Sequence, residues 1–275
     1  MIDAHQHFWR IGQNDCTWPT PDLAAIHRDF LPSDLKPLAK AAGVTGVVLV
    51  QSQPSDRDTD WLLELARADD LILGVVGWVD FKAADAPARI AQLAAAPKLR
   101  GLRPMLQGLP EDDWILDPAA APGLEAMIAA GVAFDALIFT RHLRHIRVLA
   151  RRYPELRIVI DHGAKPPIAA EAFEPWAGEI AETAKAPNIF CKLSGLLTES
   201  RADQRPDALA RYITHLFGCF GAERLVWGSD WPVLNLAGDY AGWLEFALTQ
   251  CRALNPGAEG AVFGENARRF YGLAA

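Results

Sequence analysis

The 275-residue chain lacks the features that define several large protein classes. Its four cysteines, Cys16, Cys191, Cys219 and Cys251, form no CxxC pair, which argues against a zinc knuckle and a disulfide framework. No glycine-rich GxGxxG or P-loop motif follows an apolar run, so neither a dinucleotide-binding fold nor a nucleotide phosphate site is indicated. We therefore expect reduced, buried thiols, and we look for the chemistry elsewhere in the chain.

The sequence also lacks a membrane-spanning segment and an excess of positive charge. No apolar run approaches the roughly 20 residues that cross a bilayer, and the polar start MIDAHQHF does not match a secretory signal. A formal net charge of -7, with both signs intermingled, argues against nucleic acid and anionic membranes as partners. We expect a cytoplasmic protein that acts on a small molecule, as a monomer or a small homo-oligomer.

Apolar runs rich in β-branched residues recur eight times and alternate with stretches of helical periodicity. Such alternation is typical of βα units that build a parallel sheet. Eight units without a Gly/Ser linker favour one (β/α)8 TIM-like barrel over residues 1–275 rather than a doubly wound sheet. The predicted strands are residues 2–5, 44–51, 71–79, 99–106, 132–139, 156–162, 188–195 and 224–230.

The stretches between the predicted strands include helices and one long loop. Residues 58–70 and 140–154 carry apolar side chains at helical spacing, so we predict amphipathic helices there. Residues 8–40, rich in tryptophan and proline, are a candidate wall or lid over the barrel mouth.

Two histidines, His5 and His7, stand two positions apart in the first predicted strand. Strand side chains alternate between faces, so both histidines should project to one side, together with Asp3, into the barrel. The end of a barrel strand is where such enzymes keep their active sites. Taken alone, the pair is equally consistent with two structural histidines.

The sixth and eighth predicted strands end in His162 and Asp230, which could join the pair. Alternation places His162 on the face of Ile160, and Asp230 on the face of Val226. Three imidazoles and one carboxylate suit a single zinc-like ion with one position left for water. Asp230 could also serve as general base and then general acid without a metal.

Five motifs in combination, IDAHQHFW, DHGAKP, CKLSG, WGSDWP and FGENARRFYGL, resemble the amidohydrolase superfamily over nearly the whole chain. They are most similar to its lactonase branch, which includes L-fuconolactonases, L-rhamnonolactonases and 2-pyrone-4,6-dicarboxylate lactonases. The resemblance implies a (β/α)8 barrel, hydrolysis of a cyclic ester, and an active site at His5, His7, His162 and Asp230. The fourth and fifth strands lack the lysine and histidine of two-metal members, which leaves one divalent ion, zinc first, or metal-free catalysis.

Further substrate contacts are predicted at strand ends and in the first long loop. A guanidinium could clamp a carboxylate or a carbonyl oxygen, amides could bind hydroxyls, and indoles could form apolar walls. Each residue also has a structural interpretation, since charged side chains near strand ends are usually exposed or paired. The predicted substrate-binding residues are Arg103, Gln51, Gln53, Lys192, Trp18, Trp231, His27 and Arg28.

The sequence therefore favours a hydrolase that opens the ring ester of a sugar-acid lactone such as L-fucono- or L-rhamnono-lactone. Water activated by Asp230 would attack the ring carbonyl, with or without one divalent metal. The alternatives are a 2-pyrone-4,6-dicarboxylate-type lactonase, an aldarolactone isomerase, a metal-dependent decarboxylase of the same superfamily and a non-catalytic binding barrel. A dicarboxylate would need cationic clamps, for which the candidates are Arg10, Arg28, Arg57, Arg103 and Arg201.

Overall fold

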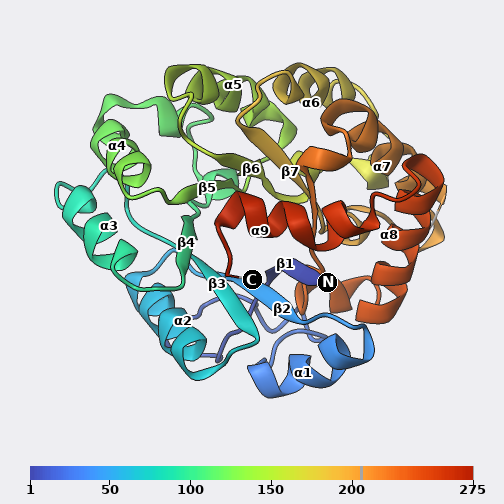
Figure 1. Ribbon diagram of the computed structural model, residues 1–275, viewed down its shortest axis with the longest axis horizontal. Helices are drawn as coiled ribbons and strands as arrows, with labels where there is room; N and C mark the ends of the chain where they lie inside the picture. The colour runs from blue at the N-terminus through green and yellow to red at the C-terminus, as the bar shows by residue number, and fades with distance from the viewer. Residues whose placement is uncertain (205–206, 275) are drawn as a thin grey trace.

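The computed structural model describes residues 1–204 and 207–274, and it shows a ring of helices around a ring of strands (Figure 1). Eight parallel strands pair side by side in sequence order, which confirms the predicted TIM-type barrel. Each strand lies inside its predicted range, except that the first runs one residue further. The strands are β1 (Ile2–Gln6), β2 (Gly46–Val50), β3 (Ile72–Gly77), β4 (Leu99–Leu102), β5 (Ala133–Ala136), β6 (Ile158–Ile160), β7 (Ile189–Leu193) and β8 (Leu225–Trp227).

Helices follow the strands and cover the outside of the barrel (Figure 1). The predicted helices appear as α2 and α5, and the long first loop ends earlier than predicted because it contains α1. No helix in the described ranges is long and apolar enough to cross a membrane. The helices are α1 (Pro32–Ala41), α2 (Asp56–Ala68), α3 (Ala86–Ala94), α4 (Ala121–Ala129), α5 (Leu143–Arg152), α6 (Trp176–Ala184), α7 (Asp207–Phe220), α8 (Tyr240–Leu254) and α9 (Asn266–Tyr271).

Two apolar layers follow from the alternation of side chains along the strands. In β2, Val47 and Leu49 belong to the outer cluster that packs against the helices. Val48 and Val50 belong to a smaller inner cluster that fills the barrel. Because most strand residues are buried on both faces, strands such as β2, β6 and β8 are continuous hydrophobic runs, as is usual for parallel sheets.

The last helix, α9, lies across the end of the barrel where β1 begins (Figure 1). Its Phe270 and Tyr271, together with Leu273, are members of the inner apolar cluster. This end of the barrel is therefore closed by apolar packing. The carboxyl ends of the strands, at the opposite mouth, carry the polar residues.

Strand β1 contains an irregularity that changes the predicted direction of Asp3. Its Asp3 pairs with Val47 of β2 and its Gln6 with Leu49, so three steps on β1 match two on β2. Such a bulge re-aims side chains and is common beside active sites. Here Asp3 faces outward and accepts a 3.0 Å hydrogen bond from the Tyr240 hydroxyl of α8. The prediction that Asp3 shares the inner face with the two histidines is therefore wrong.

Candidate active site

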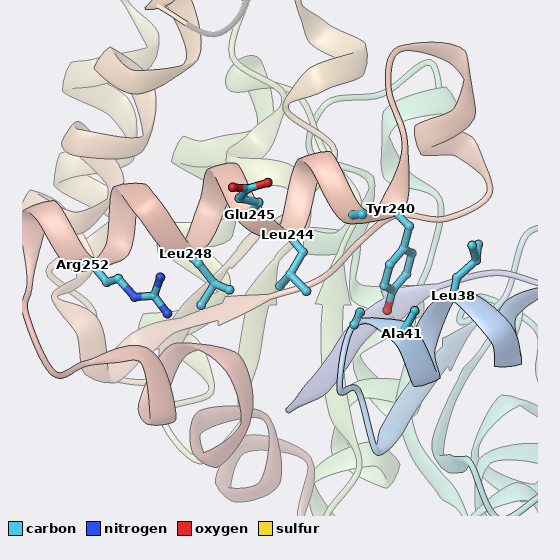
Figure 2. Close-up of a pocket in the computed structure, with 9 residues that line it drawn as sticks. Leu38, Ala41, Tyr240, Leu244, Glu245, Leu248 and Arg252 are labelled. Carbon is cyan, nitrogen blue, oxygen red and sulfur yellow. The ribbon is translucent and has the colours of Figure 1, made fainter.

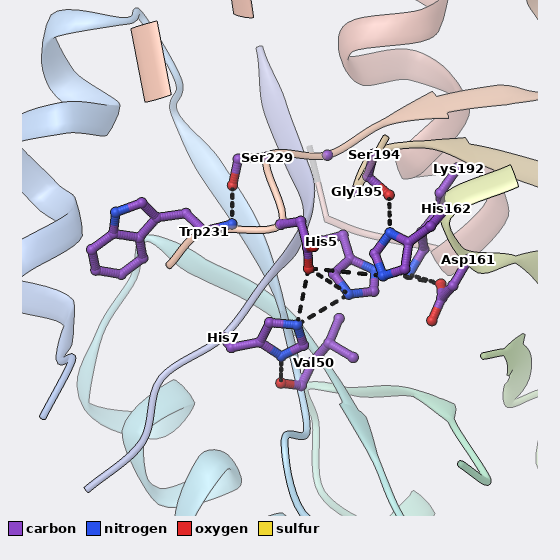
Figure 3. Close-up of polar contacts among 12 residues, drawn as sticks. His5, His7, Val50, Asp161, His162, Lys192, Ser194, Gly195, Ser229 and Trp231 are labelled. Carbon is purple, nitrogen blue, oxygen red and sulfur yellow. Dashed lines mark hydrogen bonds and ion pairs between the residues drawn. The ribbon is translucent and has the colours of Figure 1, made fainter. Parts of the chain in front are cut away.

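The three predicted histidines meet at the carboxyl ends of β1 and β6 (Figure 3), and the predicted aspartate, Asp230, lies beside them after the end of β8. Asp230 Oδ1 lies 3.3 Å from His7 Nε2, 3.7 Å from His5 Nε2 and 3.8 Å from His162 Nε2. The Nε2 atoms of His5 and His7 are 3.2 Å apart. All four side chains are buried, so each contact is made largely without competition from water.

His162 and Asp230 reach the mouth through left-handed backbone conformations. Their φ angles are 54° and 60°, values that are uncommon for residues other than glycine and that cluster at functional sites. Strand β6 ends at Ile160, whose side chain belongs to the outer cluster. The predicted alternation from Ile160 to His162 therefore does not hold, because the turn after β6, and not the strand, directs the imidazole.

Neighbouring groups fix two of the imidazoles. His7 Nδ1 lies 2.8 Å from the carbonyl oxygen of Val50, and His162 Nδ1 lies 2.8 Å from Ser194 Oγ. A Cβ atom on Gly195 would stand 2.4 Å from His162 Nδ1, so only glycine leaves room for that ring. Neither Ser194 nor Gly195 was predicted as a site residue, although both belong to the CKLSG motif.

A layer of buried charge lies directly below the histidines. Lys192 Nζ contacts Asp135 Oδ2 at 2.6 Å, Asp161 Oδ1 at 3.0 Å and His5 Nδ1 at 3.0 Å. The Tyr271 hydroxyl of α9 donates a 2.6 Å hydrogen bond to Asp135 Oδ2. Buried charges are tolerated only when they are paired and hydrogen-bonded, which this layer provides.

Both terminal nitrogens of the Arg103 guanidinium donate hydrogen bonds to other groups of the protein. One terminal nitrogen donates to Asp161 Oδ2 at 3.0 Å, and the other donates to Gln51 Oε1 at 2.8 Å and to the Gln51 carbonyl. The side chain borders the cavity at the mouth, but it has few hydrogens left for a substrate. Gln51 stands behind Arg103 and orients it rather than facing the cavity.

Burial and neighbouring groups set the charge of the site. Burial lowers the pKa of His162 to about 4 and holds the pKa of His5 well below its ordinary value. Burial alone would raise the pKa of Asp230, but the adjacent His162, His7 and His5 bring it well below the usual range. At neutral pH the mouth therefore contains an ionised carboxylate facing neutral His5 and His162.

Three of these side chains, His5, His7 and Asp230, place their ligand atoms close enough together for one divalent ion. A tetrahedral ion with bonds of about 2.0–2.1 Å has ligand atoms roughly 3.3–3.4 Å apart. The separations of 3.2, 3.3, 3.7 and 3.8 Å described above bracket this spacing. Asp161 also lies within reach of His5 and His162, but its oxygens are already occupied by Lys192 and Arg103. His5, His7 and Asp230, with His162 beside them, could thus hold a metal.

A cavity of about 250 Å³ opens above these residues and has His7, His162 and Asp230 in its wall. Among the predicted substrate residues, Trp18, Gln53 and Arg103 line it. No motif or periodicity pointed to the apolar part of the wall, because it comes from loops after different strands. The lining residues that were not predicted as substrate contacts are Thr17, Ser52, Pro54, Met105, Gln107, Leu137, Lys165 and Val233.

The other five predicted substrate residues, Gln51 among them, lie outside the cavity wall. Trp231 is buried against Phe30, because the left-handed turn at Asp230 directs the next side chain into the outer core. Arg28 is exposed and pairs with Asp34, and His27 contacts the backbone carbonyl of Pro19. Lys192 is fully buried in the charged layer below the mouth.

A separate groove of about 240 Å³ lies between α1 and α8, away from the strand ends (Figure 2). Its wall is mainly apolar, with Leu38 and Leu244 on opposite sides and Arg252 at one end. No histidine lines it, so the groove lacks the groups that distinguish the mouth.

Known proteins resemble this chain both in sequence and in fold. The family model described as amidohydrolase matches residues 2–273. An L-fucono-1,5-lactonase from Burkholderia ambifaria is 52% identical over 98% of this chain and 94% of its own length, and one from Burkholderia multivorans is 35% identical over 99% and 96%. A crystal structure of an amidohydrolase from Burkholderia multivorans with bound zinc has a TM-score of 0.93 at 33% identity and covers 99% of both chains.

Proposed function

This chain belongs to the amidohydrolase family, and on that basis we propose that it hydrolyses the ring ester of a sugar-acid lactone, with L-fucono-1,5-lactone as the first substrate to test. The main observation in support of the proposal is that the ionised Asp230 faces three histidines. These residues border a cavity that is large enough for a small ring. The lactonase activity of the 52% identical relative supports the choice of substrate class.

Asp230 acts as the proton-transferring residue of the reaction. Its low pKa keeps it ionised, so it can accept a proton from the water whose oxygen attacks the ring carbonyl carbon. When the bond between that carbon and the ring oxygen breaks, Asp230 returns the proton to the leaving alkoxide. The products are a free hydroxyl and a carboxylic acid, which ionises at neutral pH and releases its proton to water.

We propose that His5, His7, His162 and Asp230 can hold one divalent ion, with zinc as the first candidate. When bound, such an ion polarises a carbonyl oxygen as a Lewis acid. The ligand-atom separations support this assignment, as does the zinc in the 33% identical structure. Metal content measured on purified protein, with and without a chelator, will decide whether turnover depends on it.

The cavity favours a neutral, hydroxylated ring over a dicarboxylate. Ser52 and Gln107 offer hydrogen bonds to hydroxyl groups, whereas the Gln53 amide is bonded to Thr17, Trp18 and Ser52. Arg103 is likewise largely occupied by protein groups. Of the other arginines that could have clamped a pyrone dicarboxylate, those at positions 28, 57 and 201 are at least half exposed and paired with acidic residues. These contacts support a sugar lactone as the substrate.

A pH-indicator assay with L-fucono-1,5-lactone, an aldarolactone and a pyrone dicarboxylate tests the proposal. We expect hydrolysis of the first, and chromatography of the products separates hydrolysis from isomerisation. The Asp230→Asn variant should keep its fold and lose roughly 10²- to 10⁴-fold in kcat, because general acid–base catalysis contributes about that factor.

The exposed Asp113→Asn substitution is the matched control and should retain wild-type turnover. Near wild-type turnover of the Asp230→Asn variant would contradict the role given to Asp230. Absence of hydrolysis with every lactone would contradict the proposed function itself.

We also propose that the protein works in the cytoplasm as a monomer or a small homo-oligomer. Its four cysteines are free thiols, which supports a reducing compartment. Cell fractionation and light scattering test these two points.

A further inference from the structure

The buried amide of Gln53 is bonded mainly to the first long loop of the barrel. Its Oε1 accepts hydrogen bonds from the backbone N–H groups of Thr17 at 3.2 Å and Trp18 at 3.4 Å, and its Nε2 donates to the Trp18 carbonyl at 2.7 Å. A fourth contact joins Nε2 to Ser52 Oγ at 3.1 Å. The amide therefore pairs with both the N–H and the carbonyl of Trp18, as the backbone of a neighbouring strand would.

Gln53 is itself fixed by the barrel. Its side chain is 1% exposed, and the residue follows the end of β2 by three positions. The Asp58 carboxylate, in the first turn of α2, accepts hydrogen bonds from the backbone N–H groups of Ser52 and Gln53 at 3.0 and 3.2 Å. Strand β2 and helix α2 thus hold in place the residue that fastens the loop.

Trp18 belongs to the wall of the active-site cavity, together with Gln53 and His7. Its ring packs edge-on against the buried Trp9 at a centroid distance of 5.5 Å, and the ring of Trp9 lies 6.4 Å from that of His7. Trp9 is anchored by a 2.8 Å hydrogen bond from its Nε1 to the carbonyl oxygen of Arg28. Trp18 is half-buried, so it combines a supported side with an accessible one.

The Gln53 amide is the main support for the peptide groups on either side of Trp18. In the described chain, the other side-chain hydrogen bonds between this part of the loop and the segment after β2 involve Asp15. Its carboxylate accepts a 2.6 Å hydrogen bond from Ser55 and pairs with an exposed arginine, three residues before Trp18. The Cys16 thiol donates to the Trp18 carbonyl at 3.2 Å, but a thiol is a weak donor.

We propose that Gln53 is a positioning residue that holds Trp18 in the cavity wall, where the indole binds an apolar face of the substrate ring. An aromatic side chain offers a ring ligand a large apolar contact area, and it binds best when its position is fixed beforehand. This inference rests on the proposed function, because the ring is that of the lactone. It also accounts for an amide that lies at the cavity but is turned towards the loop.

Steady-state kinetics with L-fucono-1,5-lactone separate positioning from catalysis. Gln53→Met is nearly isosteric but cannot form the three hydrogen bonds to the loop. It should raise KM roughly tenfold and leave kcat within about twofold of wild type, because the lost contact serves the ground state and the transition state equally. Gln13→Met, the same substitution at an exposed position of the same loop, should change neither constant. An unchanged KM in folded Gln53→Met protein, or a roughly tenfold loss of kcat, contradicts the proposal.

A double-mutant cycle determines whether Gln53 acts through Trp18. Trp18→Ala alone should raise KM at least roughly tenfold, since an apolar contact with the ring is lost. In that background Gln53→Met should change KM by less than about twofold, because the side chain that it positions is already absent. A normal KM for Trp18→Ala, or effects of the two substitutions that multiply, would show that Gln53 acts by another route.

Amide hydrogen exchange measures the attachment of the loop without turnover. The N–H groups of Thr17 and Trp18 lie outside helices and strands, yet they should be more strongly protected than that of the exposed Asp15. Gln53→Met should remove this protection. Equal protection of Trp18 and Asp15 in the wild type overturns the proposal, even where Gln53→Met fails to fold.

The two kinds of measurement distinguish failure of this inference from failure of the proposed function. A wild type that hydrolyses no lactone contradicts the proposed function and, with it, the ligand assigned to Trp18. Hydrogen exchange then still decides whether Gln53 holds the loop. Lactone hydrolysis with an unchanged KM in Gln53→Met contradicts this inference alone.

Discussion

Asp230 and Asp58 are both buried carboxylates, but their surroundings move their pKa values in opposite directions. Three imidazoles surround Asp230 and outweigh the effect of burial, so its pKa lies well below the ordinary value. Asp58, on α2, has no imidazole among the groups that act on its charge, and it accepts hydrogen bonds from the N–H groups of Ser52 and Gln53. Burial therefore raises its pKa from 3.8 to about 6. The first residue is suited to chemistry and the second to holding a loop of the cavity wall.

The raised pKa of Asp58 predicts a pH-dependent stability. The folded protein binds the proton of Asp58 more tightly than the unfolded chain, so this stabilisation is full below pH 3.8 and is lost as the pH rises through about 6. Asp58→Asn cannot ionise but retains an acceptor oxygen. Its free energy of unfolding relative to wild type should rise by up to about 3 kcal/mol between pH 4 and pH 7.

Denaturant unfolding at several pH values measures this difference. Asp56→Asn, an exposed residue in the first turn of the same helix, controls for the loss of one negative charge. A difference between wild type and Asp58→Asn that is constant from pH 4 to pH 7 is incompatible with the assigned shift.

At the scale of the elements, turns and not strands give the site its final geometry. The side chains of Lys192, in β7, and of Arg103, directly after β4, both point inward. Simple alternation of side chains along a strand predicts this direction. His162 depends on a left-handed turn, and His5 depends on the bulge in β1. Periodicity alone cannot predict either feature, because each interrupts the period on which the prediction rests.

The close approach of Gly195 to His162 gives a prediction at this scale. Gly195→Ala should displace the imidazole and lower kcat at least roughly 100-fold, since a 1 Å misplacement of a catalytic group costs about that much. Steady-state kinetics with the lactone measure the effect, and thermal unfolding measures the accompanying loss of stability.

Gly131→Ala is the matched control for this substitution. Gly131 has a φ of +65°, against +64° at Gly195, but an added Cβ there meets no atom within 4 Å. Both variants carry the same backbone penalty of roughly 1 kcal/mol, and only Gly195→Ala clashes with the site. Equal activity of the two variants would argue against the steric role of Gly195.

For the whole molecule, the sequence was sufficient to predict the barrel and the meeting of His5, His7, His162 and Asp230 at one mouth. Those predictions depend on the order of the strands and on which residues end them, and both are local properties of the sequence. The cavity wall was harder to predict, because Met105, Leu137 and Val233 come from three loops whose paths are set by packing. The distant contact between Lys192 and His5 likewise becomes visible only when the barrel is closed.

The buried cysteines give a prediction for the whole fold. Burial raises the pKa of Cys16 and of Cys251 to about 11 and also raises that of the fully buried Cys191. Because the thiolate is the reactive form, these three thiols should react slowly with a thiol reagent at pH 8 in the native protein. All four should react at once in denaturant, and rapid modification of more than one thiol in native protein would indicate a looser core.

The contacts between β1 and the segment after β8 join the first residues of the chain to residues near its end. The site can therefore be completed only late in synthesis. The Asp3 carboxylate joins the first strand to Ser229 and Tyr240, 226 and 237 positions later in the chain. Until those residues leave the ribosome, β1 presents an unpaired edge that can associate with other chains. A nascent chain therefore carries His5 and His7 through almost the whole of translation before the aspartate that completes the site exists. Selection for efficient folding must act on this interval as well as on the finished barrel.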